Sequence, residues 1–149
     1  MNDEQTYFII GSETSEFLKV EVLNYIYPDD TDWHAGNLLK AKIQIKVGGF
    51  SASFFAELEA TSFGGFKNEL RRIYHDPKGI TQFYSLEDWI IIKLKADGLG
   101  NFEVLCYACD FPPMGNKLEF ELKKINQTYL TELTVQLNKI LEKFPVKGT

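Results

Sequence analysis

Residues 117–145 read KLEFELKKINQTYLTELTVQLNKILEKFP, and this stretch decides how the fold ends. Its first part alternates apolar and charged residues, which is typical of a strand with one buried face. After the polar residues Asn126-Gln127-Thr128, apolar residues recur every three or four positions. That spacing predicts an amphipathic helix over about 127–143, whose apolar side closes the core. The apolar residues of this helical segment are Leu130, Leu133, Leu137, Ile140, Leu141 and Phe144.

A hairpin is predicted upstream, where an alternating segment at 38–47 is followed by Gly48-Gly49. Glycine adopts the positive φ angles of a two-residue turn, so we expect Val47 to face Phe50. This register places the apolar residues of both strands on one face of the hairpin. It pairs Ile45 with Ala52, Ile43 with Phe54, Ala41 with Ala56 and Lys40 with Glu57.

The remaining segments predict further strands and one more helix. Residues 62–76 have helical spacing, with Ser62 as the N-cap and Asp76-Pro77 as the end. A change of phase near Val22 indicates either a bulge in the strand at 17–27 or a strand that is covered on both faces. The strands are expected over 17–27, 80–84, 89–96, 101–109 and 117–124, with Ala96 facing Phe102 and Lys95 facing Glu103.

This order of elements predicts an α+β fold: a curved antiparallel β-sheet with two α-helices packed on one face, the second of them C-terminal. The sequence contains no visible repeat and no linker. A length of 149 residues is that of one ordinary domain, so residues 1–149 are predicted to form a single α+β domain.

Charge and hydropathy exclude several classes of protein. The acidic start has only a short apolar run, unlike a signal peptide, and the longest apolar run is too short to span a bilayer. Two cysteines do not make a disulfide framework. The net charge of −5 argues against a nucleic-acid binder, which needs a basic surface. We therefore expect a cytoplasmic protein with no membrane or nucleic-acid partner.

The acidic residues gather at the beginning of the chain. Residues 1–32 carry eight acidic groups and one lysine, whereas the remainder carries thirteen acidic and fifteen basic groups. Solubility and turn formation explain such residues, because Asp side chains bond nearby backbone amides. The alternative is that Asp29, Asp30, Asp32 and Trp33 bind a basic partner, since an acidic face attracts one.

No motif predicts catalysis, a cofactor or a metal. Cys106 and Cys109 have redox spacing but lie on one strand, where positions three apart point to opposite faces, so Cys106 is expected in the core. Neither His34 nor His75 has a partner at a catalytic spacing. The acidic turn at 29–32 lacks the ligand pattern of a calcium loop. The sequence therefore predicts a protein that is not an enzyme.

Several short motifs lie in order along about 28–145: Asp32-Trp33, Leu70 and Tyr74, Gly79, residues 87–89, residues 118–122, Gln127-Thr128-Tyr129-Leu130 and Phe144-Pro145. Together they resemble the WapI-type bacterial immunity proteins, small α+β proteins encoded beside polymorphic toxins. In this family an Asp commonly precedes Gln-Thr-Tyr, and Asn126 stands there in this chain; both residues cap helices.

The resemblance implies a protein that binds and blocks a cognate toxin domain, often a nuclease, by stoichiometric inhibition. Nuclease domains tend to be basic, which suits the acidic segment. Two other functions stay open. The chain could hold a small ligand in a cavity between the sheet and the final helix, lined by Phe54 and Phe120. It could also be a structural subunit, which predicts self-association or a partner that is not a toxin. The oligomeric state is not determined by the sequence.

Overall fold

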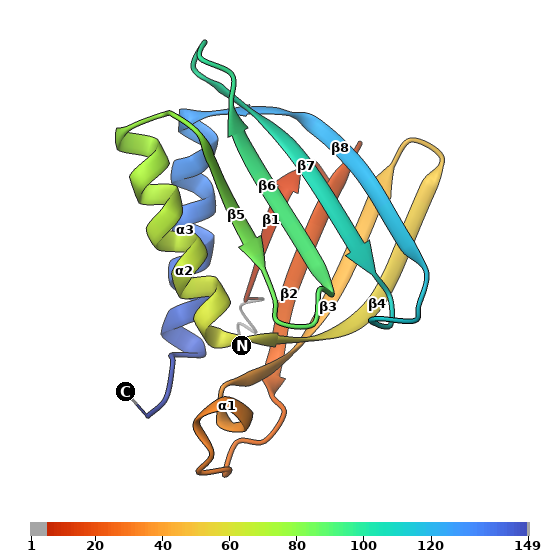
Figure 1. The fold of residues 1–149 in the computed structure, drawn as a ribbon, viewed down its shortest axis with the longest axis vertical. Coiled ribbons are helices and arrows are strands. Elements are labelled where there is room, and N and C mark those ends of the chain that lie inside the picture. The colour runs from red at the N-terminus through yellow and green to blue at the C-terminus, as the bar shows by residue number, and fades with distance from the viewer. Residues whose placement is uncertain (1–5, 149) are drawn as a thin grey trace.

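The computed structural model describes residues 6–148 and confirms the α+β fold class (Figure 1). Residues 6–148 form eight strands and three helices, and the last helix is C-terminal. The elements are β1 (Thr6–Gly11), β2 (Phe17–Tyr25), α1 (Trp33–Gly36), β3 (Leu38–Val47), β4 (Phe50–Glu59), α2 (Ala60–His75), β5 (Ile80–Tyr84), β6 (Ile90–Ala96), β7 (Asn101–Cys109), β8 (Lys117–Asn126) and α3 (Gln127–Lys143).

The strands form two antiparallel sheets, where the sequence analysis expected one curved sheet. Sheet 1 has the order β1-β2-β3-β4 and sheet 2 the order β5-β6-β7-β8. The division arises because β4 runs directly into α2, which carries the chain away from sheet 1 before β5 begins. Each half therefore ends in a long helix after four strands in a meander. The sequence did not reveal this repeat of elements.

The predicted registers are confirmed in both sheets. Val47 faces Phe50 across the turn, and Lys40 faces Glu57 as expected. Only Gly48 of the turn has a positive φ, of 56°, which corresponds to a II′ hairpin turn. In sheet 2 the expected pairing of Ala96 with Phe102 is also present. The predicted bulge lies between Val22 and Asn24 in β2.

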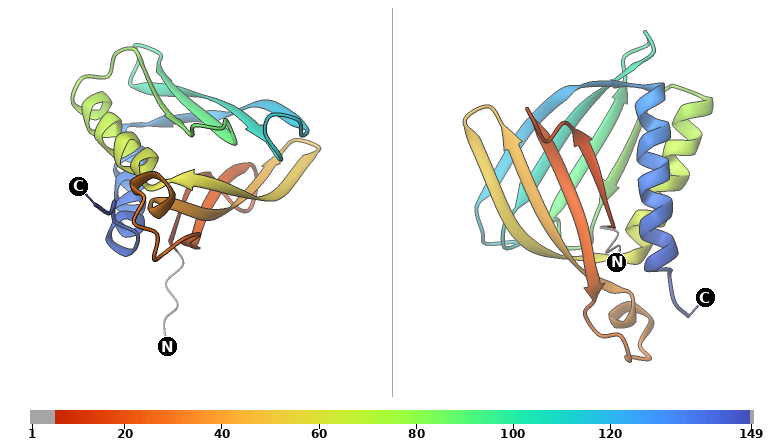
Figure 2. Two further views of the ribbon diagram at one scale, coloured as in Figure 1. Left: turned by 60° about the horizontal axis from the view of Figure 1, so that its bottom comes forward. Right: turned by 180° about the vertical axis from the view of Figure 1, so that it is seen from behind.

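The two long helices lie side by side and cover one side of the molecule. α3 lies against β1 and α2 lies against β5, so each helix covers the first strand of one sheet (Figure 2). The inner faces of the sheets and the apolar faces of the helices contribute to one hydrophobic cluster. Phe8 of β1 joins these parts, because its ring lies 5.6 Å from that of Phe83 in β5 and 5.8 Å from that of Phe66 in α2.

The final helix agrees with the prediction over 127–143. Asn126 is its N-cap, and the Asn126 Oδ1 atom accepts a hydrogen bond of 3.0 Å from the Tyr129 amide. Its apolar stripe faces the core, with Leu133, Leu137 and Ile140 fully buried. In the family that the sequence resembles, an Asp commonly stands at this position. Because Asn126 caps the helix as an Asp would, the difference does not affect the fold prediction.

Several local predictions were wrong or incomplete. The N-cap of α2 is Glu59 and not Ser62, since the helix begins early enough to bury Ala60. β1 was not predicted as a strand, because Tyr7 and Ile9 on its outer side are apolar too and no alternation is visible. α1 was not predicted either, since only the acidic turn just before it was recognised. The single-domain prediction over 1–149 stays a prediction, and residues 1–5 and 149 lie outside the described part.

Candidate interaction surface

The acidic loop at 29–32 is exposed, and two of its three carboxylates build the loop itself. Asp32 caps α1, its Oδ2 atom accepting a hydrogen bond of 2.9 Å from the Ala35 amide. Asp30 Oδ1 accepts one of 2.8 Å from the Asp32 amide. The loop packs so closely that a Cβ atom at Gly36 would lie 2.8 Å from the Asp30 carbonyl oxygen. The turn chemistry expected for Asp30 and Asp32 is therefore present, and the exposed carboxylates make the loop acidic.

The C-terminal segment fixes the position of α1 and so of Trp33. The buried side chain of Asn37 donates hydrogen bonds to the carbonyls of Trp33, at 2.8 Å, and of Lys147, at 3.1 Å. Asn37 also accepts a bond of 2.8 Å from the Lys147 amide. The Lys147 ammonium in turn donates to the Pro28 carbonyl at 3.0 Å and lies 3.8 Å from the centre of the Tyr25 ring. These contacts hold the acidic loop and α1 to the end of the chain.

Trp33 lies on the rim of a groove between α1, the first turns of α2, and β5. Three of its lining residues are large apolar side chains that solvent reaches: Trp33 is 49% exposed, Tyr84 is 55% and Leu86 is 69%. The groove has a volume of about 610 Å³. Sequence reasoning missed Tyr84 and Leu86, because nothing in their local pattern links them to a residue fifty positions earlier. The other lining residues are His34, Glu59, Thr61, Ser62, Gly65, Phe66, Glu69 and Gln82.

The groove also contains a buried carboxylate. Glu59 is 6% exposed, and its Oε1 atom accepts hydrogen bonds from the Leu86 amide at 3.0 Å and from Ser62 Oγ at 3.3 Å. Among residues 6–148, Glu59 forms no ion pair, whereas Glu69 pairs with Arg72 at 3.2 Å. Buried charges in proteins are usually paired. The groove therefore combines three exposed apolar side chains with a negative charge that a cationic side chain could neutralise.

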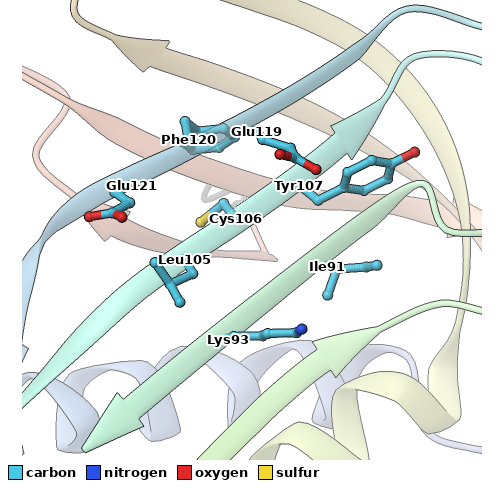
Figure 3. Close-up of a pocket in the computed structure, with 8 residues that line it drawn as sticks. All are labelled: Ile91, Lys93, Leu105, Cys106, Tyr107, Glu119, Phe120 and Glu121. Atoms are coloured by element: carbon cyan, nitrogen blue, oxygen red, sulfur yellow. The ribbon is translucent and has the colours of Figure 1, made fainter. Parts of the chain in front are cut away.

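A second hollow of about 490 Å³ lies on sheet 2 (Figure 3). Figure 3 shows Lys93 on β6 and the carboxylates of Glu119 and Glu121 on β8, with Leu105 on β7 between them. Cys106 does not act as a nucleophile here, since burial raises the pKa of its thiol to about 12 and keeps it protonated at neutral pH. The arrangement is a polar surface with an apolar floor.

The predicted chemistry of the cysteines and histidines can be placed in the fold. Cys106 is buried in the core as expected, and Cys109 is buried but separate from that cluster; both are free thiols. His34 lines the groove, and His75 lies at the exposed end of α2. In the described part of the chain, no group of three or more His, Cys, Asp or Glu residues could hold a metal ion. None of its helices is long and apolar enough to cross a membrane.

Phe54 and Phe120, the residues expected to line a ligand cavity, both pack against the hydrophobic core. Phe54 lies on sheet 1 and stacks on Trp89, whereas Phe120 lies on sheet 2 beside the second hollow. On α3, Leu133 and Leu137 have no accessible surface. A side chain that lines even a water-sized cavity keeps some accessible area, so this face of α3 packs without such a space. No observation favours the small-ligand function.

Comparison with known proteins decides the family. The model of the family described as "Immunity protein WapI-like family" matches residues 8–145. The chain belongs to this family. The resemblance noted in the sequence is therefore confirmed, and WapI-like membership supports an immunity function. It implies a protein toxin as the partner and suggests a protein that is not an enzyme.

Two further comparisons add no functional information. No curated protein matches the chain. Among solved structures, the chain is similar to one titled "Crystal structures of trypanosoma bruciei MRP1/MRP2", at 10% identity and a TM-score of 0.47. That similarity covers 94% of this chain and 84% of the other. Its TM-score is too low to carry an argument.

Proposed function

We propose that this protein binds one cognate toxin domain in the cytoplasm and neutralises it by stoichiometric inhibition. The toxin domain is basic, and a nuclease fits that description. The observation that carries the proposal is the WapI-like family match over residues 8–145. The groove beside the acidic loop supports a location for the contact, since it combines exposed apolar side chains with unpaired negative charge.

The chemistry of the groove suits a protein partner. Binding energy in interfaces is concentrated in a few residues, and Trp and Tyr are enriched among them. Trp33 and Tyr84 are such anchors, and both are about half exposed. Asp29, Asp30 and Asp32 flank the groove and would speed the association of a basic partner, because complementary charge acts mainly on the association rate. The three aspartates and Trp33 are thus proposed as binding residues, together with Tyr84 and Leu86.

The test starts from the toxin domain encoded next to this gene. We expect co-expression to relieve the growth arrest that the toxin domain causes, and a one-to-one complex to form from the purified proteins. If the neighbouring product causes no arrest that this protein relieves, and does not bind it, the proposed function is wrong.

Charge and structure can be separated at the acidic loop. Asp30→Asn and Asp32→Asn keep an oxygen that can accept the loop hydrogen bonds, but remove the charge, and Asp29→Lys alters a side chain with no recorded bond. We expect the combined variant to fold and to associate with the toxin domain at least tenfold more slowly at low salt. Replacing Glu119 and Glu121 of β8 by Lys changes the net charge by the same amount away from the loop. If both variants slow the association with the toxin domain equally, the loop is not part of the contact.

The contribution of the exposed apolar side chains is tested by measuring how fast the complex with the toxin domain dissociates. Trp33→Ala is expected to increase the dissociation rate, because truncating a buried interface anchor typically costs about 2 kcal/mol or more, which is about thirtyfold in affinity. Trp33 is half exposed in the free protein, so its replacement removes some buried apolar surface, and the urea midpoint of the variant shows whether it still folds. Leu99 is 84% exposed in the turn between β6 and β7, and Leu99→Ala serves as the matched control. A Trp33 variant that dissociates at the control rate would show that the groove is not used.

A further inference from the structure

Within the described residues 6–148, the two sheets have four edge strands, and only one of these is both uncovered and uncharged along most of its length. α3 lies against β1 and α2 lies against β5. β8 is an edge of sheet 2, and charged residues alternate along it. β4 is an edge of sheet 1, and its residues 50–56 read FSASFFA without a charge. Proteins usually protect a free edge with charges or a covering element, because an unprotected edge pairs with another strand.

β4 lies at the margin of the molecule with its outer side free. Figures 1 and 2 show the β3–β4 hairpin on the side of the molecule away from the two long helices. Phe50 is 65% exposed and Phe55 is 53%, and the two serines between them are exposed too. The Lys40 ammonium lies 4.7 Å from the centre of the Phe55 ring.

The backbone groups that point away from β3 can be assigned from the turn. In a two-residue hairpin the residues flanking the turn form a hydrogen-bonded pair, so Phe50 bonds to Val47 and every second residue after Phe50 also bonds to β3. The amide and carbonyl groups of Ser51, Ser53 and Phe55 therefore point outward. Within residues 6–148, no hydrogen bond to these outward groups is recorded.

We propose that β4 pairs antiparallel with β4 of a second copy, about a two-fold axis at Ser53, to join the two copies of sheet 1. This register places a large side chain opposite a small one along the strand. Phe55 lies opposite Ser51 of the partner copy, Phe54 opposite Ala52 and Phe50 opposite Ala56. Opposed residues on one face of an antiparallel pair are in contact, so this match fills the interface without ring clashes. The proposal is independent of the toxin contact.

Charge does not oppose the pairing. Lys40, whose ammonium lies over the Phe55 ring, faces the carboxylate-bearing Glu57 on β4. Lys42 and Lys46 face Phe55 and Ser51 from β3, one strand behind the edge in each copy. Across the interface they are separated by three strand spacings, which is about 14 Å and longer than the Debye length of ~8 Å at physiological salt. Glu57 lies opposite Gly49 of the partner copy, so no like charges are directly opposed.

A cysteine placed on the axis tests both the dimer and its register. Ser53→Cys brings two thiols together across a hydrogen-bonded pair, whose Cα atoms lie about 5.5 Å apart and within disulfide range. Ser51→Cys is the matched control, since Ser51 and its copy would be about 14 Å apart in this register. The native cysteines are buried. We expect mild oxidation to cross-link the Ser53 variant into a species of twice the 17.1 kDa chain mass, and not the Ser51 variant.

Association of the protein without any substitution is measured by sedimentation over a range of protein concentrations. The expected result is a reversible dimer that Ser53→Lys dissociates, because a lysine on the edge protects it from pairing. Gln44→Lys adds the same charge on β3 directly opposite Ser53, one strand inside the edge, and should leave the dimer intact. A protein that stays monomeric at every concentration, or cysteine variants that cross-link equally, would overturn the proposal. Neither result bears on toxin binding.

Discussion

The side chain of Asn37 joins α1 to the C-terminal segment, 110 residues away, and its removal is the sharpest test of how the candidate surface is held. Asn37 is 2% exposed and makes three hydrogen bonds, two to Lys147 and one to Trp33. A net contribution of about 0.5–1.5 kcal/mol for each bond gives about 1.5–4.5 kcal/mol in total. The backbone groups are partly exposed, and water can replace some bonds in the variant. We therefore expect Asn37→Ala to lower the free energy of unfolding by about 2 kcal/mol.

Urea denaturation followed by tryptophan fluorescence measures this change. With a slope of about 2 kcal/mol per molar urea, the midpoint should fall by about 1 M. Asn24→Ala is the matched control, because the Asn24 side chain bonds only to the neighbouring Tyr25 carbonyl and is exposed. Its midpoint should move by less than a quarter of that shift. If the two variants unfold at the same urea concentration, the three bonds of Asn37 contribute no net stability and the proposed anchoring of Trp33 is wrong.

Three further predictions concern the core and the caps. Phe8→Ala should lower the free energy of unfolding by about 3–5 kcal/mol, since the buried ring contacts both a helix and the second sheet. Urea titration followed by circular dichroism would measure this loss, and a loss under 1 kcal/mol would contradict the packing. Asn126→Ala should cost about 1 kcal/mol by removing the cap bond to Tyr129, whereas Asn126→Asp should retain most of the stability; equal losses would argue against the cap. Burial raises the pKa of Cys106 from 9.0 to about 12, so the folded state holds this proton more tightly than the unfolded state. Stability is then full below pH 9 and falls as the pH rises toward 12, and Cys106→Ala should flatten this fall in unfolding measured at several pH values.

Elements whose signal lies within a few neighbouring residues could be predicted from the sequence. The hairpin at Gly48 was predicted with the correct register, because the turn and the alternation of side chains constrain the same pairing. The final helix was predicted over 127–143, because its apolar residues and its cap at Asn126 lie in one continuous segment. The start of α2 was misplaced, since Ser62 is the stronger local signal while burial of Ala60 depends on the rest of the core.

The candidate surface could be predicted only in part. Asp29 to Asp32 and Trp33 were recognisable by charge and residue type within one segment. Tyr84 and Leu86 were not, because only the packing of β5 beside α2 brings them to the groove. The sequence shows that residue 59 is a glutamate, but it does not show that Glu59 is buried without an ion pair among the described residues.

The sequence by itself determined the α+β class, the strand registers next to tight turns, the final helix and the family, because each depends on local spacing or on short motifs. Tertiary structure decided the rest. The division of the strands between two sheets depends on where α2 leads the chain after β4, and the groove depends on contacts between residues far apart in sequence. The physical reason is that side-chain periodicity specifies which face of an element is buried, whereas its partner is chosen by the packing of the whole core.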